Sequence, residues 1–328
     1  MKALLTGASG FIGSHLAEHL LSRGYTLRCL LRKTSSTAWL KDLPIEYVYG
    51  DLFARDALAQ AVRGVDLVIH NAGVTKAKTR EEYFQANAGG TKNILEAVLA
   101  ENPQIKRFLF VSSQTAVGPS PSAAPISEDV APHPITTYGR SKLQAEQECL
   151  EVADRIPVTI VRLPAVYGQR DKDIFEFFNT MSRGLQPVVG FREKYVSLLH
   201  VRDVVRGIVM AAESPVAAGR TYFVTSKEVY GWKQVGDITK RVLGKRAFRL
   251  AIPESGVYII AAFAEMFARF SPKPALINFE KARDMVQDYW TCEGSRAKAD
   301  FGYEQEVSLE DGIRETVAWY REHGWLQL

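Results

Sequence analysis

The stretch Thr6-Gly7-Ala8-Ser9-Gly10-Phe11-Ile12-Gly13 decides the fold, because it stands between a short apolar run and a helical pattern. Lys2 to Leu5 predicts a strand, and Ile12 to Ser22 predicts a helix. Glycines in such a turn allow unusual backbone angles, a close approach of a pyrophosphate and tight packing of helix on strand. The stretch therefore predicts a dinucleotide-binding turn, although its G-x-x-G-x-x-G spacing is one residue longer in the first gap than the common motif.

The rest of the first half alternates strand-like and helical runs, which is typical of a parallel sheet covered by helices on both faces. We therefore expect an α/β fold with a Rossmann-type, doubly wound parallel sheet. A proline-rich segment, Gly118 to Pro134, predicts a long exposed loop. The further predicted strands are Leu27 to Leu31, Glu46 to Tyr49, Leu67 to His70, Phe108 to Ser112 and Val158 to Arg162, and the helices are Arg55 to Val62, Tyr83 to Ala100 and Tyr138 to Ala153.

The end of the second strand indicates which nicotinamide cofactor binds. An acid there would bind the ribose hydroxyls and repel a 2′-phosphate, but the run Leu30 to Ser35 contains none. Arg32, followed by Lys33, predicts NADP(H), with Arg32 pairing with the 2′-phosphate; a solvated loop arginine, and hence NAD, is the alternative. After the third strand, Asp51 and Leu52 predict a contact with the adenine, and a helix-capping role is the alternative for Asp51.

A phenol and an ammonium stand four residues apart in Tyr138-Gly139-Arg140-Ser141-Lys142, so both project from one helix face. The charge of Lys142 is expected to lower the phenol's pKa from about 10, so that Tyr138 can exchange a proton with a substrate. Ser113 ends the fifth strand at the sheet edge where ligands bind in such folds. Its hydroxyl is predicted to polarise the reacting oxygen of the substrate.

These segments together resemble the extended short-chain dehydrogenase/reductase family of the NAD-dependent epimerase/dehydratase type, over the whole chain. The motifs are TGASGFIG at 6–13, HNAG at 70–73, VSS at 111–113, YGRSK at 138–142, PAVYG at 164–168 and HVRDV at 200–204. The resemblance implies that Ser113, Tyr138, Lys142 and Asn87 are catalytic. From their positions after strand ends, we expect Gln114, Thr115, Tyr167 and Phe191 to join Ser113 at the substrate. The resemblance also implies a cofactor site of Gly7, Ser9, Gly10, Phe11, Ile12, Gly13, Arg32, Lys33, Asp51, Leu52, Asn71, Ala72, Gly73, Tyr138, Lys142, Pro164 and Val166.

Two positions separate the branches of this family. Nucleotide-sugar epimerases and dehydratases typically have phosphate-binding Asn and Arg residues where this chain has Ala165 and Val196. The C-terminal sequence also resembles the 3β-hydroxysteroid dehydrogenase and dihydroflavonol 4-reductase-like branch. We expect an oxidoreductase that interconverts a secondary alcohol and a ketone or aldehyde on a small apolar substrate. The alternatives are a nucleotide-sugar epimerase or dehydratase with tightly held NAD, in which Arg192, Lys194, Arg283 or Arg296 grips the diphosphate, and a non-catalytic nucleotide-sensing protein.

After Gly168 the regular alternation ends, which predicts a smaller, mainly helical substrate lobe. Residues 1–165, completed by about 196–225, would bind NADP(H), and 166–195 with 226–328 would form the substrate lobe. The apolar stretch Gly256 to Phe270 is too short to span a bilayer. We expect a core helix there, rather than a helix on a membrane surface or over an apolar pocket. Further predicted elements are helices at Ile174 to Ser182, Val201 to Ala212 and Leu309 to His323 and a strand at Thr221 to Thr225.

Composition sets the remaining expectations. The 328 residues are 46% apolar and 24% charged, and a diffuse net charge of +4 argues against a nucleic-acid partner. Three scattered cysteines without metal-ligand spacing indicate a reducing compartment and no metal site. The chain begins without a signal-peptide pattern, so we expect a cytoplasmic protein without a membrane span. By analogy with the family we expect a homodimer that acts on a small-molecule substrate.

Overall fold

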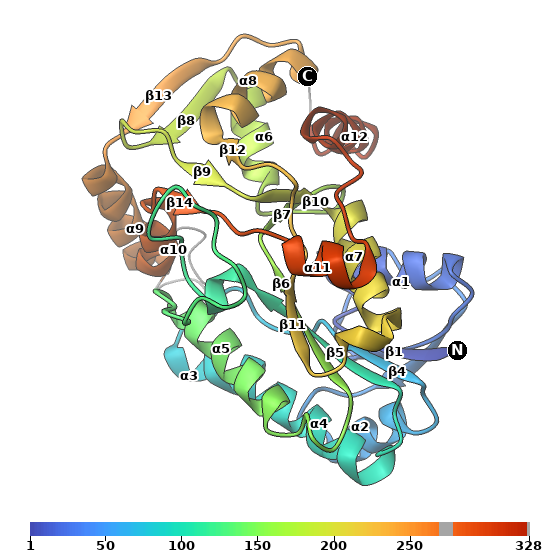
Figure 1. The fold of residues 1–328 in the computed structure, drawn as a ribbon. Helices are drawn as coiled ribbons and strands as arrows, with labels where there is room; N and C mark the ends of the chain where they lie inside the picture. The colour runs from blue at the N-terminus through green and yellow to red at the C-terminus, as the bar shows by residue number, and fades with distance from the viewer. Residues whose placement is uncertain (269–277, 327–328) are drawn as a thin grey trace.

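The sheet that the glycine turn predicts has seven parallel strands. A computed structural model describes residues 1–268 and 278–326 (Figure 1). The strand order is β11-β6-β5-β4-β1-β2-β3, and every neighbouring pair is parallel. This doubly wound order confirms the predicted Rossmann-type fold class. The strands are β1 (Lys2–Thr6), β2 (Thr26–Leu31), β3 (Ile45–Tyr49), β4 (Leu67–His70), β5 (Arg107–Ser113), β6 (Val158–Leu163) and β11 (Arg220–Phe223).

Helices cover both faces of this sheet and enclose two separate cores. Successive side chains of a strand point to opposite faces, so strands that are apolar throughout supply both cores. Leu5 belongs to the core that contains Leu16 and Val204, whereas Leu4 belongs to the core that contains Leu58 and Ile94. The first core lies under α1 (Phe11–Ser22), α7 (Val201–Glu213) and α11 (Ser295–Phe301), and the second under α2 (Arg55–Val62), α4 (Gly90–Glu101) and α5 (Thr137–Leu150).

A smaller lobe sits beyond the carboxyl end of the sheet, above it in Figure 1. The chain enters this lobe directly from β6, through β7 (Ala165–Tyr167), which pairs with β10 (Leu198–His200). Its own core contains Phe178, Leu243 and Ile313. The lobe comprises α6 (Phe175–Ser182), β8 (Leu185–Val189), β9 (Tyr195–Val196), β12 (Tyr230–Gly231), α8 (Trp232–Leu243), β13 (Phe248–Ile252), α9 (Glu254–Ala268), α10 (Phe279–Met285), β14 (Tyr289–Trp290) and α12 (Leu309–Glu322).

The helix expected over Tyr83 to Ala100 is interrupted. It consists of α3 (Arg80–Phe84), a π-helical turn over Gln85–Gly89, and α4. Thr79 begins α3 with a capping box, in which its side chain accepts from the Glu82 amide and the Glu82 side chain accepts from the Thr79 amide. The π turn holds one extra residue per turn, a feature frequent at functional sites.

The loop expected to be exposed from Gly118 to Pro134 is partly buried. Ser120 is buried, and its amide donates to the Tyr289 carbonyl at 2.9 Å. Ile126 bridges to Cys292 of the C-terminal part. Residues 121–125 and 131–133 are exposed, as predicted. The exposure prediction failed for the rest because prolines exclude helix and sheet but do not prevent a loop from packing against another segment.

The expectation of a core helix at Gly256 to Phe270 is wrong for the described part of it. In α9 the buried residues are Val257 and Ala261, while most of the large apolar side chains are exposed. Residues 269–270 of the predicted stretch lie outside the described residues. Across the part of the chain that the structure describes, no helix is both long and apolar enough to cross a membrane.

Candidate active site

The turn between β1 and α1 has the shape of a phosphate cradle. Gly7 has φ +74°, and a Cβ there would come within 2.8 Å of the Ala72 amide nitrogen. A Cβ on Gly13 would overlap the Gly7 carbonyl oxygen. Gly10 caps α1 without a side-chain hydrogen bond, and the first turn of α1 carries no acid. Free amide groups at the positive end of a helix fit a pyrophosphate, as the sequence predicts.

A buried hydrogen-bond network holds the adjoining strand end in place. Thr6 Oγ1 lies 2.7 Å from His70 Nδ1, and His70 Nε2 lies 3.0 Å from Thr91 Oγ1. The Ala72 amide donates to Thr6 Oγ1 at 3.1 Å. Burial lowers the pKa of His70 to about 3, so its ring is neutral. The network positions Asn71, Ala72 and Gly73, which were predicted to let the cofactor lie close to the backbone, directly after β4.

The residues predicted to bind the adenosine part lie at neighbouring strand ends. Arg32 and Lys33 follow β2, and both are exposed. Neither forms an ion pair with any residue within 1–268 or 278–326. The Asp51 carboxylate accepts from the Phe53 amide at 2.8 Å, so it closes a turn, while Ala54 is the N-cap of α2. A free cation after β2 fits a 2′-phosphate.

Ser113 and Tyr138 meet at the carboxyl edge of the sheet. Ser113 is the last residue of β5, and its Oγ accepts from the Thr115 amide at 3.2 Å and from the Thr115 hydroxyl at 2.9 Å. Tyr138 lies in the first turn of α5, where Thr136 caps the helix by accepting from the Gly139 amide. The Ser113 hydroxyl lies close enough to the Tyr138 phenol to lower its pKa. Sequence positions 25 residues apart are therefore brought into one site.

The predicted effect of Lys142 on the phenol is not found. Lys142 Nζ donates to the Val111 carbonyl at 2.8 Å and lies 4.0 Å from the centroid of the Phe110 ring. Burial raises the pKa of Tyr138 to about 12, although the Ser113 hydrogen bond opposes the rise. Burial likewise lowers the pKa of Lys142 to about 8. The prediction was wrong because both side chains are buried. Desolvation raises the pKa of the phenol and lowers that of the ammonium, and the motif alone does not show that the two residues are buried.

Asn87 and Ser141 connect the π turn to α5 behind this pair. Asn87 Nδ2 donates to Ser141 Oγ at 2.9 Å and to the Val74 carbonyl at 3.1 Å, while its Oδ1 accepts from the Val74 amide at 2.8 Å. The side chain is buried and its hydrogen-bonding groups are satisfied. In this structure Asn87 therefore ties the loop after β4 to the helix that carries Tyr138 and Lys142.

A buried acid that the motif reading missed stands one turn beyond Lys142. Glu146 accepts from Ser112 Oγ at 2.6 Å and forms an ion pair with Arg162 at 2.6 Å. The Ser112 hydroxyl is therefore engaged in a structural hydrogen bond, and Ser113 is the serine of the two that can contact a substrate at the strand end. The i, i+4 spacing to Lys142 could have indicated Glu146, but only the fold brings Arg162 of β6 to it.

Of the residues predicted to contact the substrate, some lie next to Ser113 and others lie in the core or on the surface of the smaller lobe. The Gln114 side chain is buried beside Ser113, and its Nε2 has no hydrogen-bond partner within the described chain. Pro164 and Val166 follow β6 as predicted. Tyr167 instead lies in the core of the smaller lobe, 5.2 Å from the His200 ring between centroids, and is buried. Phe191 is 84% exposed on the turn after β8. The latter two expectations are corrected, because position after a strand end does not determine direction.

Helix α10 contributes Glu280 and Asp284, which sequence reasoning did not select, and Arg283, which it considered only for a diphosphate. Its Glu280 carboxylate accepts from the Thr137 amide at the start of α5, and Arg283 Nη1 donates to the Ile135 carbonyl at 2.9 Å. Asp284 Oδ1 is buried with no hydrogen-bond partner in the described residues, and its negative charge acts on Tyr138. Burial raises the pKa of Asp284 to about 6. More than 140 residues separate α10 from Tyr138, so no local pattern could have indicated this contact.

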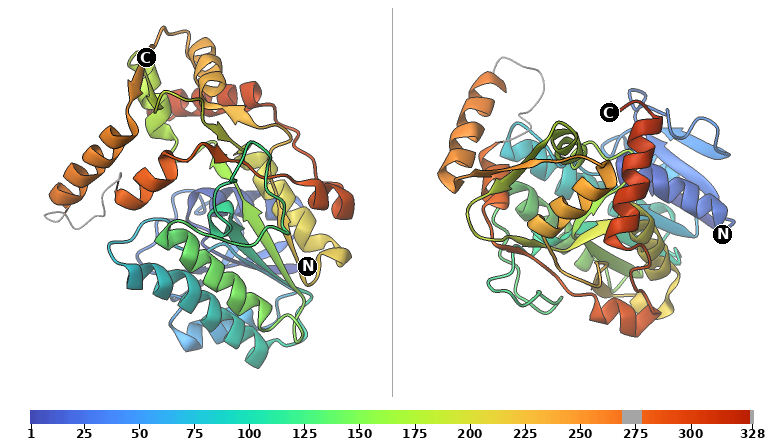
Figure 2. Two further views of the ribbon diagram at one scale, coloured as in Figure 1. Left: turned by 60° about the vertical axis from the view of Figure 1, so that its left-hand side comes forward. Right: turned by 90° about the horizontal axis from the view of Figure 1, so that it is seen from above.

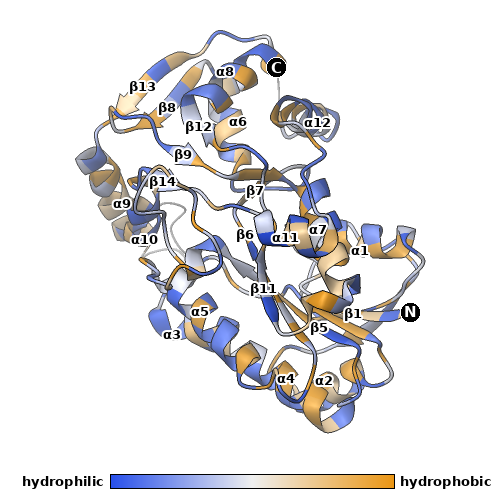
Figure 3. Cartoon of the chain, in the orientation of Figure 1, coloured by the Kyte–Doolittle hydropathy of each residue, from blue (hydrophilic) through white to orange (hydrophobic). Residues whose placement is uncertain are grey.

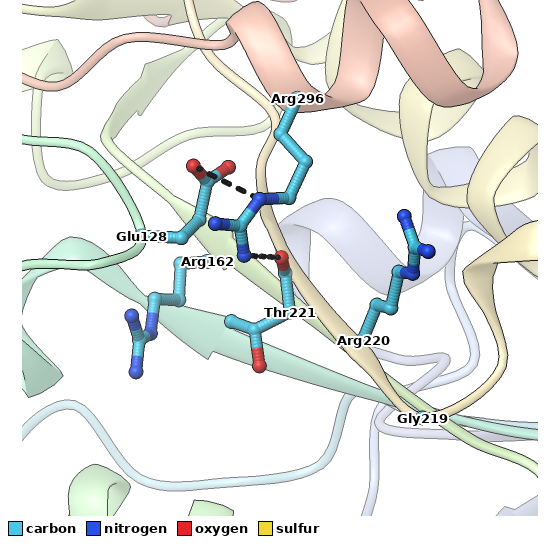
Figure 4. A pocket seen from close by; sticks show the side chains of 6 residues that line it. All are labelled: Glu128, Arg162, Gly219, Arg220, Thr221 and Arg296. Atoms are coloured by element: carbon cyan, nitrogen blue, oxygen red, sulfur yellow. Dashed lines mark hydrogen bonds and ion pairs between the residues drawn. The ribbon is translucent and has the colours of Figure 1, made fainter.

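Several cations considered for a diphosphate are already engaged. Lys194 Nζ is within 3.0 Å of carboxylate oxygens of Glu254 and Asp288. Arg296 pairs with Asp129 at 2.7 Å and lines a polar cavity of about 480 Å³ beside β6 and β11 (Figure 4). Neither Ser113 nor Tyr138 lines this cavity. Within the described residues no group of three His, Cys, Asp or Glu side chains is arranged to hold a metal ion.

Comparison with known proteins agrees with this geometry. The model of the NAD dependent epimerase/dehydratase family matches residues 3–225. A ceramide reductase of Caulobacter vibrioides is 30% identical over 98% of this chain and 95% of its own. A 3 beta-hydroxysteroid dehydrogenase/Delta 5→4-isomerase of Mycobacterium tuberculosis is 26% identical over 97% and 90%. The solved structure of gox2253 has a TM-score of 0.83, 28% identity and 99% coverage of both chains. The chain therefore belongs to the NAD dependent epimerase/dehydratase family, with 3β-hydroxysteroid dehydrogenase-like relatives.

Proposed function

We propose that this chain is an NADP(H)-dependent oxidoreductase that interconverts a secondary alcohol and a ketone or aldehyde. The observation that carries the proposal is the close approach of Ser113, at the end of β5, to Tyr138, with Lys142 one helical turn further along α5. The pair lies at the carboxyl edge of the sheet, where ligands bind in doubly wound folds. The turn at Gly7 to Gly13 at the same edge fits a dinucleotide.

We propose a separate role for each side chain of the site in the reduction of a carbonyl group. In the reducing direction, the carbonyl carbon accepts a hydride, which the bound nicotinamide supplies. Ser113 donates a hydrogen bond to the carbonyl oxygen, and Tyr138 transfers its phenolic proton to that oxygen, which completes the alcohol. Ser113, which lowers the pKa of Tyr138, stabilises the phenolate that remains, and Lys142, whose pKa of about 8 leaves it charged at neutral pH, contacts the cofactor. Asn87 positions α5 through Ser141.

The cofactor preference rests on Arg32 and Lys33. Both are exposed after β2, without ion pairs to the described residues, and no acid stands at the end of that strand. We propose that the chain prefers NADP(H) to NAD(H), because Arg32 can pair with the 2′-phosphate. We also propose that residues 1–165, completed by 196–225, hold the cofactor, and that 166–195 with 226–328 hold the substrate.

We propose a substrate with a mainly apolar body and a polar group next to the reacting carbonyl. The names of the relatives, a ceramide reductase and a 3 beta-hydroxysteroid dehydrogenase, support the apolar body. The unpartnered Gln114 Nε2 and Asp284 Oδ1 support the polar group, since the buried donor favours a hydrogen bond to a ligand and the buried acceptor favours one from a ligand. The occupied Lys194 and Arg296 favour this class over a nucleotide diphosphate.

The test is a comparison of ketones and nucleotide-sugars with the purified full chain. We expect consumption of NADPH with long-chain or polycyclic ketones dispersed in detergent, and much slower consumption with NADH. Epimerisation of a UDP-sugar without net change of a co-purified NAD would instead identify a nucleotide-sugar enzyme. Binding of NADPH with no turnover of any ketone or alcohol would indicate a nucleotide-sensing protein, and either result would overturn the proposal.

A further inference from the structure

Five large apolar side chains lie exposed on one face of α9. Successive residues of a helix are about 100° apart, so these five positions fall within an arc of about 120°. No charged residue of α9 lies within that arc: Glu265 lies on another side of the helix, where its carboxylate accepts from the Phe279 amide at 2.9 Å. The five are Ile259, Ile260, Phe263, Met266 and Phe267, exposed by 57, 43, 57, 45 and 68%.

The hydrophobicity of this face is not needed for packing. The opposite side of α9 carries Val257 and Ala261, which pack with Ala282 of α10 in a small core. Among the described residues, that side attaches the helix to the lobe. Isolated exposed apolar side chains are ordinary on protein surfaces, but a contiguous group of this size marks an interaction site.

The strand ribbon that leads into α9 continues the apolar surface. Phe248 of β13 stands opposite Leu185 of β8 in the register, and both side chains are exposed, as is Leu250 two residues further on. Pro253 alone separates β13 from α9. Figures 2 and 3 show that the ribbon and the helix follow each other along one outer edge of the molecule, from which α9 projects.

Basic side chains accompany this edge. Lys245 and Arg246 in the turn before β13 are exposed, and neither forms an ion pair with a described residue. Arg249 within β13 lies on the other face of the ribbon from Phe248 and Leu250 and pairs with Asp237 at 3.9 Å, so it is not part of this group. An apolar helix face with cations beside it combines the two attractions that hold a helix in the interface of an anionic bilayer: burial of apolar area, and charge pairing with lipid headgroups.

We propose that this surface, here named the α9 edge, lies on the surface of an anionic phospholipid bilayer. The side chains of the α9 edge enter the interface of the bilayer. Helix α9 does not cross the bilayer, because it has 15 residues. The α9 edge comprises Leu185, Phe248, Leu250, Ile259, Ile260, Phe263, Met266 and Phe267, with Lys245 and Arg246 as its cations.

The position of α10 connects the α9 edge to the candidate active site. α10 packs against α9 through Ala282, and the same helix contacts the start of α5 through Glu280 and Arg283. Asp284 of α10 acts on Tyr138. A bilayer against α9 would therefore lie close to the side of the site where we propose that substrate binds. This arrangement would allow an apolar substrate to pass from the bilayer to Tyr138 without crossing water.

Flotation of the full chain with vesicles tests the proposal without any enzyme assay. We expect the protein to float with phosphatidylcholine vesicles that contain phosphatidylglycerol, and less with phosphatidylcholine alone. The double variant Phe263→Glu/Phe267→Glu should bind the anionic vesicles at least about tenfold more weakly, because two side chains that would enter the interface become charged. Lys245→Gln/Arg246→Gln should lose the preference for anionic lipid while keeping the binding to neutral vesicles.

The matched control is Leu150→Glu/Val216→Glu, which places the same charges at exposed apolar positions of α5 and of the turn before β11. It should float like the unchanged protein, and circular dichroism should show all variants folded. The proposal is overturned if the unchanged protein does not float, or if the control loses binding to the same degree. It is also overturned if sedimentation shows a dimer that Phe263→Glu/Phe267→Glu dissociates, since a second copy would then cover the α9 edge.

Discussion

Tyr138 is the residue on which the proposed chemistry most directly depends. Its ring lies 6.3 Å from that of Tyr83 between centroids, and the nearby Ser113 hydroxyl lowers its pKa. Tyr138→Phe removes the proton donor and keeps the ring. We expect kcat to fall by about 10²- to 10⁴-fold with little change in NADPH affinity, measured by steady-state kinetics and fluorescence titration. Tyr83→Phe is the matched control and should retain turnover; an equal loss in both variants would refute the assignment.

Arg32 carries the prediction of cofactor preference. The guanidinium is exposed at the end of β2 and is free to pair with a phosphate. We expect Arg32→Ala to raise KM for NADPH by about tenfold or more, since a charge-assisted hydrogen bond contributes about 1.5–3 kcal/mol, and to leave KM for NADH unchanged. Lys41→Ala, an exposed cation of the same connection, should change neither value. An equal rise for both cofactors would show that Arg32 does not contact the 2′-phosphate.

Asp284 gives the substrate site a pH dependence. Burial raises its pKa from the ordinary 3.8 to about 6, so the carboxyl becomes neutral as the pH falls through 6. For a ketone with a neighbouring hydroxyl or amide N–H, we expect KM to rise below about pH 6, because a neutral acceptor binds such a donor less strongly. Asp284→Asn should remove this pH dependence. A ketone without a donor is the control substrate, and a dependence that persists in Asp284→Asn would contradict the contact.

In the turn between β1 and α1, the close packing of the helix on the strand requires glycine at some positions. Gly13 faces the Gly7 carbonyl, whereas Gly10 caps α1, and its nearest contact for an added Cβ is at 3.3 Å. We expect Gly13→Ala to lower the free energy of unfolding by about 1–3 kcal/mol, because the helix must move away from the strand. Gly10→Ala should keep the melting temperature but bind NADPH more weakly, because the methyl group meets the phosphates. Thermal melts and cofactor titration separate the two effects, and identical behaviour would refute this distinction.

The α3–π turn–α4 segment and α5 together form the support of the site. The π turn places Asn87 where it reaches both Val74 and Ser141, which a regular helix would not achieve with the same register. Glu146 and Arg162 then fix α5 against β6. Tyr138 and Lys142 are thus held by a helix that is anchored at several points, which suits a site that must keep a hydroxyl at a fixed distance from a substrate.

At the scale of the whole molecule, His70 links the stability of the fold to pH. The ring joins β1, β4 and α4, and burial lowers its pKa from 6.5 to about 3. Between these values the unfolded chain binds a proton that the folded chain does not, so the stability that depends on a neutral His70 is present above pH 6.5 and is lost as the pH falls toward 3.

The variant His70→Gln tests this linkage. We expect the variant to be less stable at pH 7, because its hydrogen bonds to Thr6 and Thr91 change, and to lose stability less steeply than the unchanged protein as the pH falls from 6.5 to 4. Urea unfolding across that pH range measures both slopes. Parallel slopes would show that other buried groups, such as His200, whose pKa burial lowers to about 4, determine the acid response.

Most of the doubly wound sheet could be predicted because its signals are local. Apolar runs of four to seven residues, separated by helical patterns, gave strand ends that differ from the structure by no more than one residue in β1 to β6. The predictions for Gly256 to Phe270, Tyr167 and Phe191 failed for a different reason. Hydrophobicity shows that a side chain avoids water, but not whether a core, a ligand or another surface covers it.

By itself the sequence determined the fold class, the glycine turn at Gly7 to Gly13 and the candidates Ser113, Tyr138 and Lys142, because each depends on a local motif or on the end of a predicted strand. The tertiary structure alone decided that burial raises the pKa of Tyr138, that Glu146 engages Ser112, that α10 brings Asp284 to the site and that α9 turns an apolar face outward. These features depend on desolvation and on contacts between residues far apart in the chain, which follow from packing and not from local pattern.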